Sequence, residues 1–242
     1  MSPQFNTATL PLPAPLNALE LTGQARTHVV QHDAPPFAAH PQASAAFLAM
    51  RAAALREGLE LEPFSAFRDF AAQLKIWNDK WLGKRTLYDR AGAPLDYASL
   101  SEAQRVAAIL DWSALPGGSR HHWGSDIDVI DRASIPTDYR VQLLPEEFAA
   151  GGVFARLGRW LEQHACRFGF FRPYAEDRGG VCPEPWHLSY APVAQPALAA
   201  LTVDLLAATL RASALLGVGY VLPQLGAIHA RYIANVCEPP DL

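Results

Sequence analysis

The order of hydrophobic and polar positions predicts several helices with short strands between them. Apolar residues recur at helical spacing in four segments: 44–59, 69–82, 101–112 and 153–167. Strand-like patterns occupy four shorter segments: 27–30, 59–64, 126–130 and 186–190. Because these elements follow one another without a regular βαβ alternation, we predict an α+β fold.

Capping and turn residues mark the ends of the predicted helices. Gly58 and Gly169 each follow a helical segment and suit the residue that ends a helix. Ser101 and Gln104 form a capping-box pattern, which should open the third helix. Pro145 can occupy the first turn of a further short helix.

The end of the chain is also predicted to be helical. We expect two helices there, at about 196–215 and 223–236. The apolar stretch 197–216 contains Asp204 and Arg211, each of which costs about 2.5–3.5 kcal/mol at the centre of a bilayer. This stretch therefore indicates a core helix rather than a membrane span.

Composition places the chain among globular proteins. Half of its 242 residues are hydrophobic and 18% are charged, which is too apolar for a disordered chain. The formal net charge is −4 and no run of Lys or Arg stands out, so a nucleic-acid partner is not expected. We interpret the basic residues at and after the end of the second helix as a solvated helix end: Lys80, Lys84, Arg85 and Arg90.

The cysteines and the first residues bear on the compartment. Cys166, Cys182 and Cys237 are too few for a disulfide framework and odd in number. We expect Cys182 to be a small buried side chain rather than a catalytic thiol. Residues 1–17 have no cationic start and no long apolar core, so they do not resemble a signal peptide. A cytoplasmic location is therefore expected, with a periplasmic one as the alternative.

The candidate chemistry is concentrated in two short segments. Residues 119–128 read Ser-Arg-His-His-Trp-Gly-Ser-Asp-Ile-Asp, and residues 184–187 read Glu-Pro-Trp-His. Together they supply imidazoles and carboxylates that suit a catalytic zinc ion, with one carboxylate left to take a proton from water. The alternatives are a polar turn for the first segment, and a salt bridge and a core histidine for the second. Because both segments occur in one chain, a metal site is favoured.

Backbone geometry separates the candidates. In an extended chain His121 and His122 point to opposite faces, so they are not expected to bind one ion together. Asp126 and Asp128 fall on the same face of the predicted strand, which we expect to be half-buried. Pro185 fixes its own φ and restricts the residue before it. It should therefore hold the carboxylate and the imidazole on either side of it in a defined relation.

The chain resembles the zinc D-Ala-D-Ala carboxypeptidases of the VanY type, whose fold is shared with the Hedgehog signalling domain. The first family motif, Ser-x-His-x-x-Gly-x-x-x-Asp, is filled by Ser119, His121, Gly124 and Asp128. The second, Glu-x-Trp-His, is filled by Glu184, Trp186 and His187. Residues 65–69 and the later Gln73 are similar to a family turn that contains an arginine and precedes a glutamine. The resemblance extends over about residues 44–191.

The resemblance implies a small antiparallel sheet that carries a zinc ion, flanked by helices, with extra C-terminal helices. The implied zinc ligands are His121, Asp128 and His187. Glu184 would be the general base, and Arg68 would stabilise the developing oxyanion or hold a substrate carboxylate. An ion pair with Asp69 or another acidic residue is the structural alternative for Arg68. The implied substrate contacts are Gln73, Ser119 and Trp186.

Four positions depart from the family pattern, and two of them, Ala66 and Phe67, replace the glycine and tyrosine of the turn that contains Arg68. Asp126 stands where the family commonly has a small apolar residue, and Ser189 stands where it often has arginine. Asp126 could orient a ligand histidine, or could face solvent on an edge strand. His122 and Trp123 are expected to line the cleft or to pack beneath it.

The expected organisation has three parts: a proline-rich extension (1–41), a zinc peptidase domain (42–195) and a helical extension packed on it (196–242). The implied reaction is zinc-dependent carboxypeptidase cleavage of peptidoglycan stem peptides of the D-Ala-D-Ala type, and the implied partner is a small peptide or peptidoglycan fragment. The alternatives are an endopeptidase or other short-peptide hydrolase, and a catalytically silent module that zinc stabilises. Glu184 and Arg68 favour an enzyme, because a structural zinc ion needs neither. The sequence does not indicate an oligomeric state.

Overall fold

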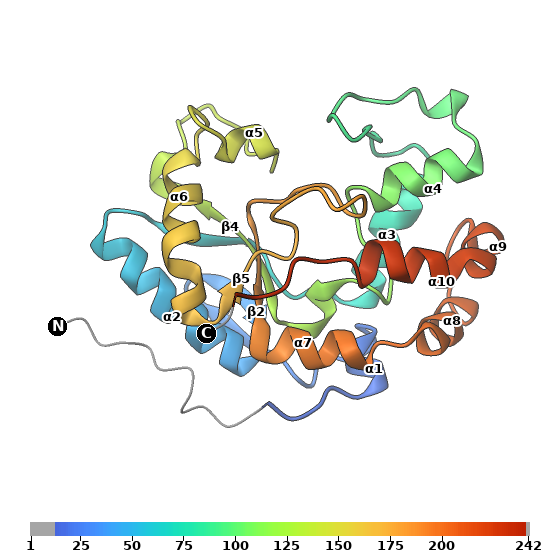
Figure 1. Cartoon of the computed structure of the whole chain (residues 1–242), viewed down its shortest axis with the longest axis horizontal. Coiled ribbons are helices and arrows are strands. Elements are labelled where there is room, and N and C mark those ends of the chain that lie inside the picture. The colour runs from blue at the N-terminus through green and yellow to red at the C-terminus, as the bar shows by residue number, and fades with distance from the viewer. Residues whose placement is uncertain (1–12, 241–242) are drawn as a thin grey trace.

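The computed structural model describes residues 13–240 (Figure 1). Its helices are α1 (Ala18–Leu21), α2 (Pro41–Arg56), α3 (Phe70–Trp81), α4 (Glu102–Leu110), α5 (Pro145–Phe148), α6 (Ala155–His164), α7 (Ala191–Ala200), α8 (Val203–Arg211), α9 (Val218–Val221) and α10 (Leu225–Ile228). Its strands are β1 (Val30–Asp33), β2 (Pro36–Ala39), β3 (Leu61–Ser65), β4 (Asp126–Asp131), β5 (Phe170–Phe171) and β6 (His187–Tyr190). The predicted α+β fold with additional C-terminal helices is confirmed.

The strands form two antiparallel sheets. β1 and β2 make a separate hairpin, and the main sheet has the order β3-β4-β6-β5. β4 therefore lies inside the main sheet, between β3 and β6. In the β4–β6 ladder Asp128 is opposite His187, and Asp126 is opposite Ser189. Because residues that face each other on neighbouring strands project to the same side, this register gathers four polar side chains on one face.

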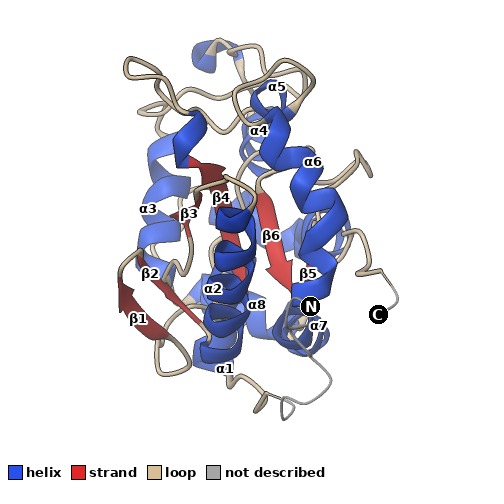
Figure 2. Cartoon of the chain, turned by 90° about the vertical axis from the view of Figure 1, so that its left-hand side faces the viewer, coloured by secondary structure: helices blue, strands red, loops and turns tan. Residues whose placement is uncertain are grey.

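Both faces of β4 are buried. Ile127 and Val129 project into an apolar core beneath α2 and α6, which cover this face of the sheet (Figure 2). Asp126 and Asp128 project to the other face and are only 0% and 6% exposed. The predicted alternation is present, but the expected half-buried strand is wrong. The polar face is covered by the 3₁₀ turn at 120–123 and by the chain around it instead of by water.

A second apolar core joins the C-terminal helices to α3 and α4. The buried Trp77 and Trp123 lie in it together with Leu206 and Leu210 of α8. The C-terminal helices are therefore packed on the rest of the chain. The domain boundaries expected near residues 41 and 195 stay a prediction, and the first 12 residues of the proline-rich segment lie outside the described part.

The prediction of one long helix over 196–215 is wrong. α7 and α8 occupy this region and are bent by 76° at their junction. Thr202 starts the second helix, because its hydroxyl accepts the backbone N–H of Leu205. The helix expected at 223–236 is broken into α10 and a π-helical turn at 229–233. In the described part of the chain no single helix has the length and hydropathy of a membrane span. The bent pair α7 and α8 reaches that length and hydropathy only when the two helices are taken together.

The predicted end signals of the other helices are confirmed. Gly58 after α2 and Gly169 after α6 have positive φ angles of 74° and 77°, which is the left-handed conformation that favours glycine. Ser101 and Gln104 form the capping box of α4. The strand expected at 27–30 begins only at residue 30, because a turn precedes it.

Candidate metal centre

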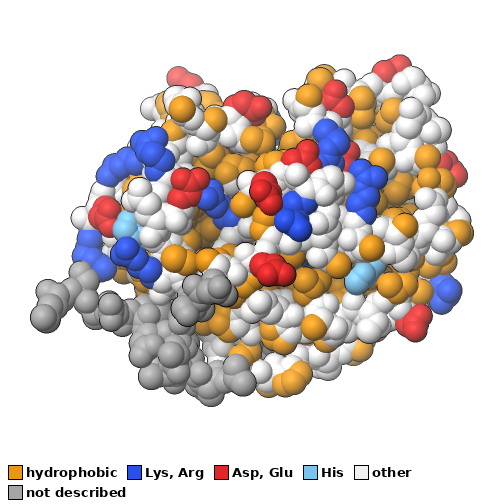
Figure 3. Space-filling model, in the orientation of Figure 1, with side chains coloured by type: hydrophobic (Ala, Val, Ile, Leu, Met, Phe, Trp, Pro, Cys, Tyr) orange, Lys and Arg blue, Asp and Glu red, His pale blue; other side chains and the backbone are white. Residues whose placement is uncertain are grey.

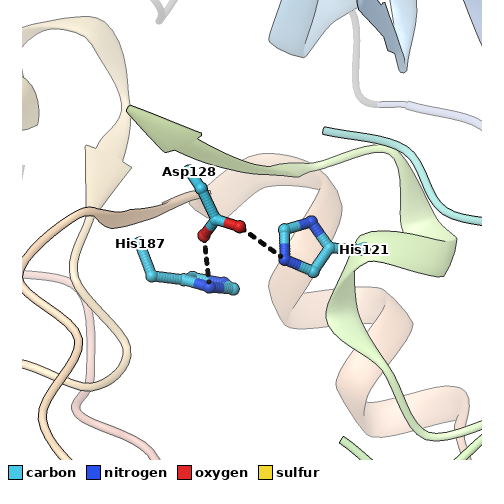
Figure 4. A group of neighbouring side chains, drawn as sticks. All are labelled: His121, Asp128 and His187. Carbon is cyan, nitrogen blue, oxygen red and sulfur yellow. Dashed lines mark ion pairs between the residues drawn. The ribbon is translucent and has the colours of Figure 1, made fainter. Parts of the chain in front are cut away.

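The polar face of the main sheet carries a cluster of two imidazoles and one carboxylate. Asp128 and His187 come from opposed positions on β4 and β6, and His121 comes from the 3₁₀ turn (Figure 4). The Nδ1 atom of His187 lies 3.1 Å from Asp128 Oδ1, and His121 Nε2 lies 3.4 Å from Asp128 Oδ2. One ligand atom from each residue lies within 4.8 Å of the others, and all three residues are buried. The structure thus brings the three predicted ligands together.

The turn that presents His121 depends on a glycine. Gly124 ends the turn with a φ of 66°, and its N–H donates to the carbonyl oxygen of His121 at 3.4 Å. A Cβ atom on Gly124 would lie 2.7 Å from the backbone nitrogen of His40. Positive φ and this close approach together leave room only for glycine.

His122 stays outside the cluster, but not for the expected reason. The chain at His121 and His122 is a 3₁₀ turn and not an extended strand. The ring of His122 is fully buried: its Nε2 accepts the N–H of Gly117 at 3.1 Å, and its Nδ1 lies 2.6 Å from the carbonyl oxygen of Arg68. Burial lowers the pKa of His122 to about 4. The neutral ring is therefore a structural link beneath the site.

Asp126 holds the second nitrogen of His187. Its Oδ1 lies 2.8 Å from His187 Nε2 and accepts the Nε–H of Arg120 at 2.9 Å. Arg120 also donates to the hydroxyl of Ser189 at 2.6 Å. Burial opposes ionisation of Asp126, but Arg120 and His187 outweigh it and keep the pKa of the carboxyl well below its usual value. The solvent-facing alternative for Asp126 is therefore wrong, since the residue is fully buried on an inner strand.

The contact with Asp126 determines which nitrogen of His187 is available. A proton on Nε2 points at Asp126, which leaves the Nδ1 lone pair directed at Asp128. Two acceptors 3.1 Å apart repel each other unless a proton or a cation lies between them. Burial lowers the pKa of His187, but hydrogen bonds with Asp126, Asp128 and Glu184 outweigh it and raise the pKa well above 6.5. The surroundings of His187 therefore favour a positive charge, which a metal cation would supply.

Glu184 lies beside the cluster without belonging to it. Its Oε2 is 3.3 Å from His187 Nδ1, and its side chain is 14% exposed. The turn between the two residues is closed by a hydrogen bond of 3.0 Å from the His187 N–H to the Glu184 carbonyl, which confirms their defined relation across Pro185. Trp186 is 4% exposed and packs against Phe148, but it also forms part of the wall of the pocket described below.

Arg68 lies on the other side of the cluster, just after β3. Its guanidinium donates to Gln73 Oε1 at 2.9 Å and to Ser65 Oγ at 2.8 Å. Its backbone N–H donates to the carbonyl of His121 at 3.2 Å, which ties it to the metal-site turn. The alternative ion pair with Asp69 is not formed, because that carboxylate caps the first turn of α3.

Of the predicted substrate contacts, Gln73 does not line the pocket and Ser119 does. Gln73 is fully buried, and its amide is used at both ends, since it accepts from Arg68 and donates to the carbonyl of Ala114 at 2.8 Å. It does not line the pocket, so the structure places it behind Arg68 and does not support the predicted contact with substrate. Ser119 does line the pocket, and its buried hydroxyl has no hydrogen-bond partner among residues 13–240.

The cluster opens into a pocket of about 310 Å³. Its lining includes Arg85, Tyr88 and Gly92, from the segment after α3, and residues 142–144, before α5. Figure 3 shows the surface hollowed between these two parts of the molecule. Tyr174 also lines the pocket, with its ring edge-on to His187 at 5.0 Å between centroids. No motif in the sequence pointed to Tyr174.

The solvated helix end expected after α3 is wrong for two of its four basic residues. Lys80 lines the pocket and donates to Ser113 Oγ at 2.7 Å. Arg90 forms ion pairs with Asp111 and Asp177 at 2.7 and 2.6 Å. The spacing could have placed Lys80 correctly, because it falls seven positions after the buried Gln73 and so shares its helix face.

Two imidazoles and a carboxylate beside a free carboxylate, in a pocket on a small antiparallel sheet, are typical of a metal-dependent hydrolase. Residues 37–193 match the sequence family described as "VanY: D-alanyl-D-alanine carboxypeptidase". The chain belongs to this family, which confirms the resemblance noted in the sequence.

Individual relatives and solved structures match parts of the chain. An uncharacterized protein of Haemophilus influenzae is 43% identical over 98 residues, which are 39% of this chain and 67% of the relative. A D-alanyl-D-alanine carboxypeptidase of Enterococcus faecalis is 29% identical over 110 residues, which are 44% of this chain but only 35% of that enzyme. The solved structure of VanYB in complex with D-alanine-D-alanine has a TM-score of 0.51 and 24% identity, covering 75% of this chain and 84% of that one. This last likeness shows the shared fold.

Proposed function

We propose that the chain is a zinc-dependent carboxypeptidase that hydrolyses a peptide bond in peptidoglycan stem peptides. One observation carries the proposal: three buried ligand atoms from His121, Asp128 and His187 cluster beside the carboxylate of Glu184 in a member of the VanY family. The names of the E. faecalis relative and of the VanYB complex support D-alanyl-D-alanine as the end of the substrate.

The donor set fits zinc. Two imidazole nitrogens and one carboxylate oxygen are usual ligands of catalytic zinc, with a fourth position left open. His187 Nδ1 and His121 Nε2 lie 3.1 and 3.4 Å from the two oxygens of Asp128, and one ligand atom from each of the three residues lies within 4.8 Å of the others, which is close enough for one ion to be held between them. When bound, zinc would lower the pKa of water and polarise a carbonyl group.

The remaining residues have roles that follow from their positions. Glu184 Oε2, next to the cluster and open to the pocket, would accept the proton of the attacking water and then transfer it to the leaving amine. The guanidinium of Arg68, held by Gln73 and Ser65, would donate to the carbonyl oxygen as negative charge develops there. The free hydroxyl of Ser119 would contact the peptide.

The test is incubation of the zinc-loaded protein with defined tetrapeptide and pentapeptide muropeptides, followed by mass analysis. We expect close to one zinc ion per chain and loss of one terminal residue. Glu184→Gln should keep the zinc and lose most turnover, because the amide cannot accept a proton. Glu176→Gln, a change at an exposed carboxylate, is the matched control. An active Glu184→Gln variant would show that another group is the base.

The same assay separates the alternatives. Cleavage of cross-linked muropeptides without release of a terminal residue would indicate an endopeptidase. Full zinc occupancy without hydrolysis of any peptide would indicate a binding module on the same fold.

A further inference from the structure

The pocket beside the cluster contains a cation that the proposed reaction does not use. Lys80 lies in the last turn of α3 and lines the pocket, on the substrate side of the cluster. Its ammonium group donates to Ser113 Oγ at 2.7 Å, and Ser113 lines the same pocket. Among residues 13–240 Lys80 forms no ion pair. A partly buried ammonium group is thus held in the pocket by a neutral hydroxyl alone.

The charges around Lys80 do not offset this arrangement. Arg68 and Arg85 line the same pocket, and both carry positive charge toward Lys80. Burial lowers the pKa of Lys80 to about 8; attraction to Glu184 opposes this shift, and repulsion from Arg85 and Arg68 adds to it. Burial of an ammonium group without a counter-ion is unfavourable. The unpaired ammonium group therefore does not stabilise the protein. Binding of an anionic ligand would account for its place in the pocket.

The neighbouring cations are less suited to that ligand. Arg68 is already held by Gln73 and Ser65 and faces the cluster, where the proposed reaction uses it. Arg85 is half exposed and lies 3.8 Å from Asp79, so its charge is shared with a carboxylate outside the pocket. Lys80 lines the pocket and has no carboxylate partner among residues 13–240, so it can form an ion pair with an anionic ligand. The hydroxyl of Ser113 beside it can donate a second hydrogen bond to that ligand.

We propose that Lys80 and Ser113 form a subsite that binds a carboxylate of the peptide substrate. This proposal rests on the proposed function, because it assumes that a peptide enters the pocket. A stem peptide offers two sources of this group: the α-carboxylate at its C-terminus and the free carboxylate of an internal acidic residue. An ammonium–carboxylate hydrogen bond suits either one.

The test compares Lys80→Met, which removes the charge but keeps most of the chain length, with the zinc-loaded parent protein. The substrates are a pentapeptide ending in D-Ala-D-Ala, the same peptide with a C-terminal amide, and the same peptide with its internal carboxylate amidated. We expect KM for the unmodified peptide to rise about 10- to 100-fold, the usual loss for a hydrogen bond to a charged group. Zinc content should not change, and kcat should change much less than KM.

The amides identify the source of the carboxylate. The subsite binds the α-carboxylate if the C-terminal amide abolishes the difference between parent and variant, and the internal carboxylate if the other amide does so. Lys80→Arg should restore most of the affinity. Lys84→Met, an exposed lysine on the same segment, should leave KM unchanged. Equal KM values for parent and Lys80→Met on all three peptides would overturn the subsite.

A binding measurement separates this proposal from the proposed function. Calorimetry with zinc-loaded Glu184→Gln gives the affinity for the same peptides without turnover. If no peptide is hydrolysed but binding weakens when Lys80 is also changed, the subsite stands and the reaction is wrong. If hydrolysis occurs and neither KM nor the affinity depends on Lys80, the reaction stands and the subsite is wrong.

Discussion

Arg120 and Lys80 are two of the cations that line the pocket beside the cluster, and their surroundings differ. Arg120 is 3% exposed, and its guanidinium contacts Asp126 at 2.9 Å, Ser189 at 2.6 Å and the ring of Trp123 at 4.9 Å. Lys80 contacts one hydroxyl group and has no carboxylate partner among residues 13–240. A buried charge with a full set of partners fixes the position of its neighbours. A buried charge without such partners destabilises the free protein, and it can still form an ion pair with a bound ligand.

The largest expected effect comes from breaking the Arg120 pair. Asp126→Ala leaves a buried guanidinium without its carboxylate, so the free energy of unfolding should fall by about 3–5 kcal/mol. Urea denaturation of the metal-free protein measures this without a contribution from zinc. The double variant Arg120→Met/Asp126→Ala should recover part of the loss. A double variant less stable than Asp126→Ala would contradict the pairing.

A smaller effect is expected when the shape is kept and only the charge is removed. Asp126→Asn should weaken zinc binding about 10- to 100-fold, because the residue behind a ligand histidine sets the orientation and basicity of its ring. Competition with a chromophoric chelator measures the affinity. Asp204→Asn, at the exposed start of α8, is the control. Unchanged affinity in Asp126→Asn would limit Asp126 to pairing with Arg120.

The unpaired cation should show in the pH dependence of catalysis. The pKa of Lys80, lowered to about 8, means that the ammonium group is charged below that pH and loses its charge above it. The ratio kcat/KM for the peptide whose carboxylate binds at Lys80 should therefore fall as pH rises through about 8, relative to that for its amide. Arg85, Arg68 and Glu184 are the charged groups that act on Lys80, and they affect both peptides. In Lys80→Arg the charge persists above pH 8, so this relative fall in kcat/KM should disappear. If the fall remains in Lys80→Arg, it belongs to another titrating group.

The smallest effect concerns stability. Lys80→Met removes an unpaired charge and should raise the free energy of unfolding by about 1 kcal/mol, whereas Arg120→Met should lower it. Parallel urea titrations of the two variants give the comparison directly. A loss of stability in Lys80→Met would mean that the hydrogen bond to Ser113 stabilises the fold.

The sequence predicted what depends on local patterns. Helix caps such as Ser101 and Gly58 were confirmed, because each acts through neighbouring backbone groups. His121, Asp128 and His187 were found through motifs; the β4–β6 register pairs Asp128 with His187, and the 3₁₀ turn adds His121. The break at Thr202 was missed, because hydrophobic spacing continues through it and only the capping hydrogen bond marks the new helix.

Contacts between segments that are distant in the sequence could not be predicted from the sequence. The position of Asp126 depends on which strands flank β4, and no local pattern contains that information. Lys80 looked like a surface residue because its environment is made by distant segments, including Ser113 and the loop that carries Glu184. Gln73 was expected to touch substrate, but a hydrogen bond to the carbonyl of Ala114, 41 positions away, holds it in the interior.

The ladder between β4 and β6 couples metal binding to the stability of the sheet. Asp128 and His187 form one rung of that ladder, and beside it the Val129 N–H donates to the carbonyl of Trp186 at 3.1 Å. An ion held by both side chains would link the two strands through residues that lie 59 positions apart in sequence. Hydrogen exchange at Val129 should therefore slow when zinc is added and speed up when a chelator removes it. The zinc concentration would then affect the lifetime of the β4–β6 hydrogen bonds as well as the rate of the proposed reaction.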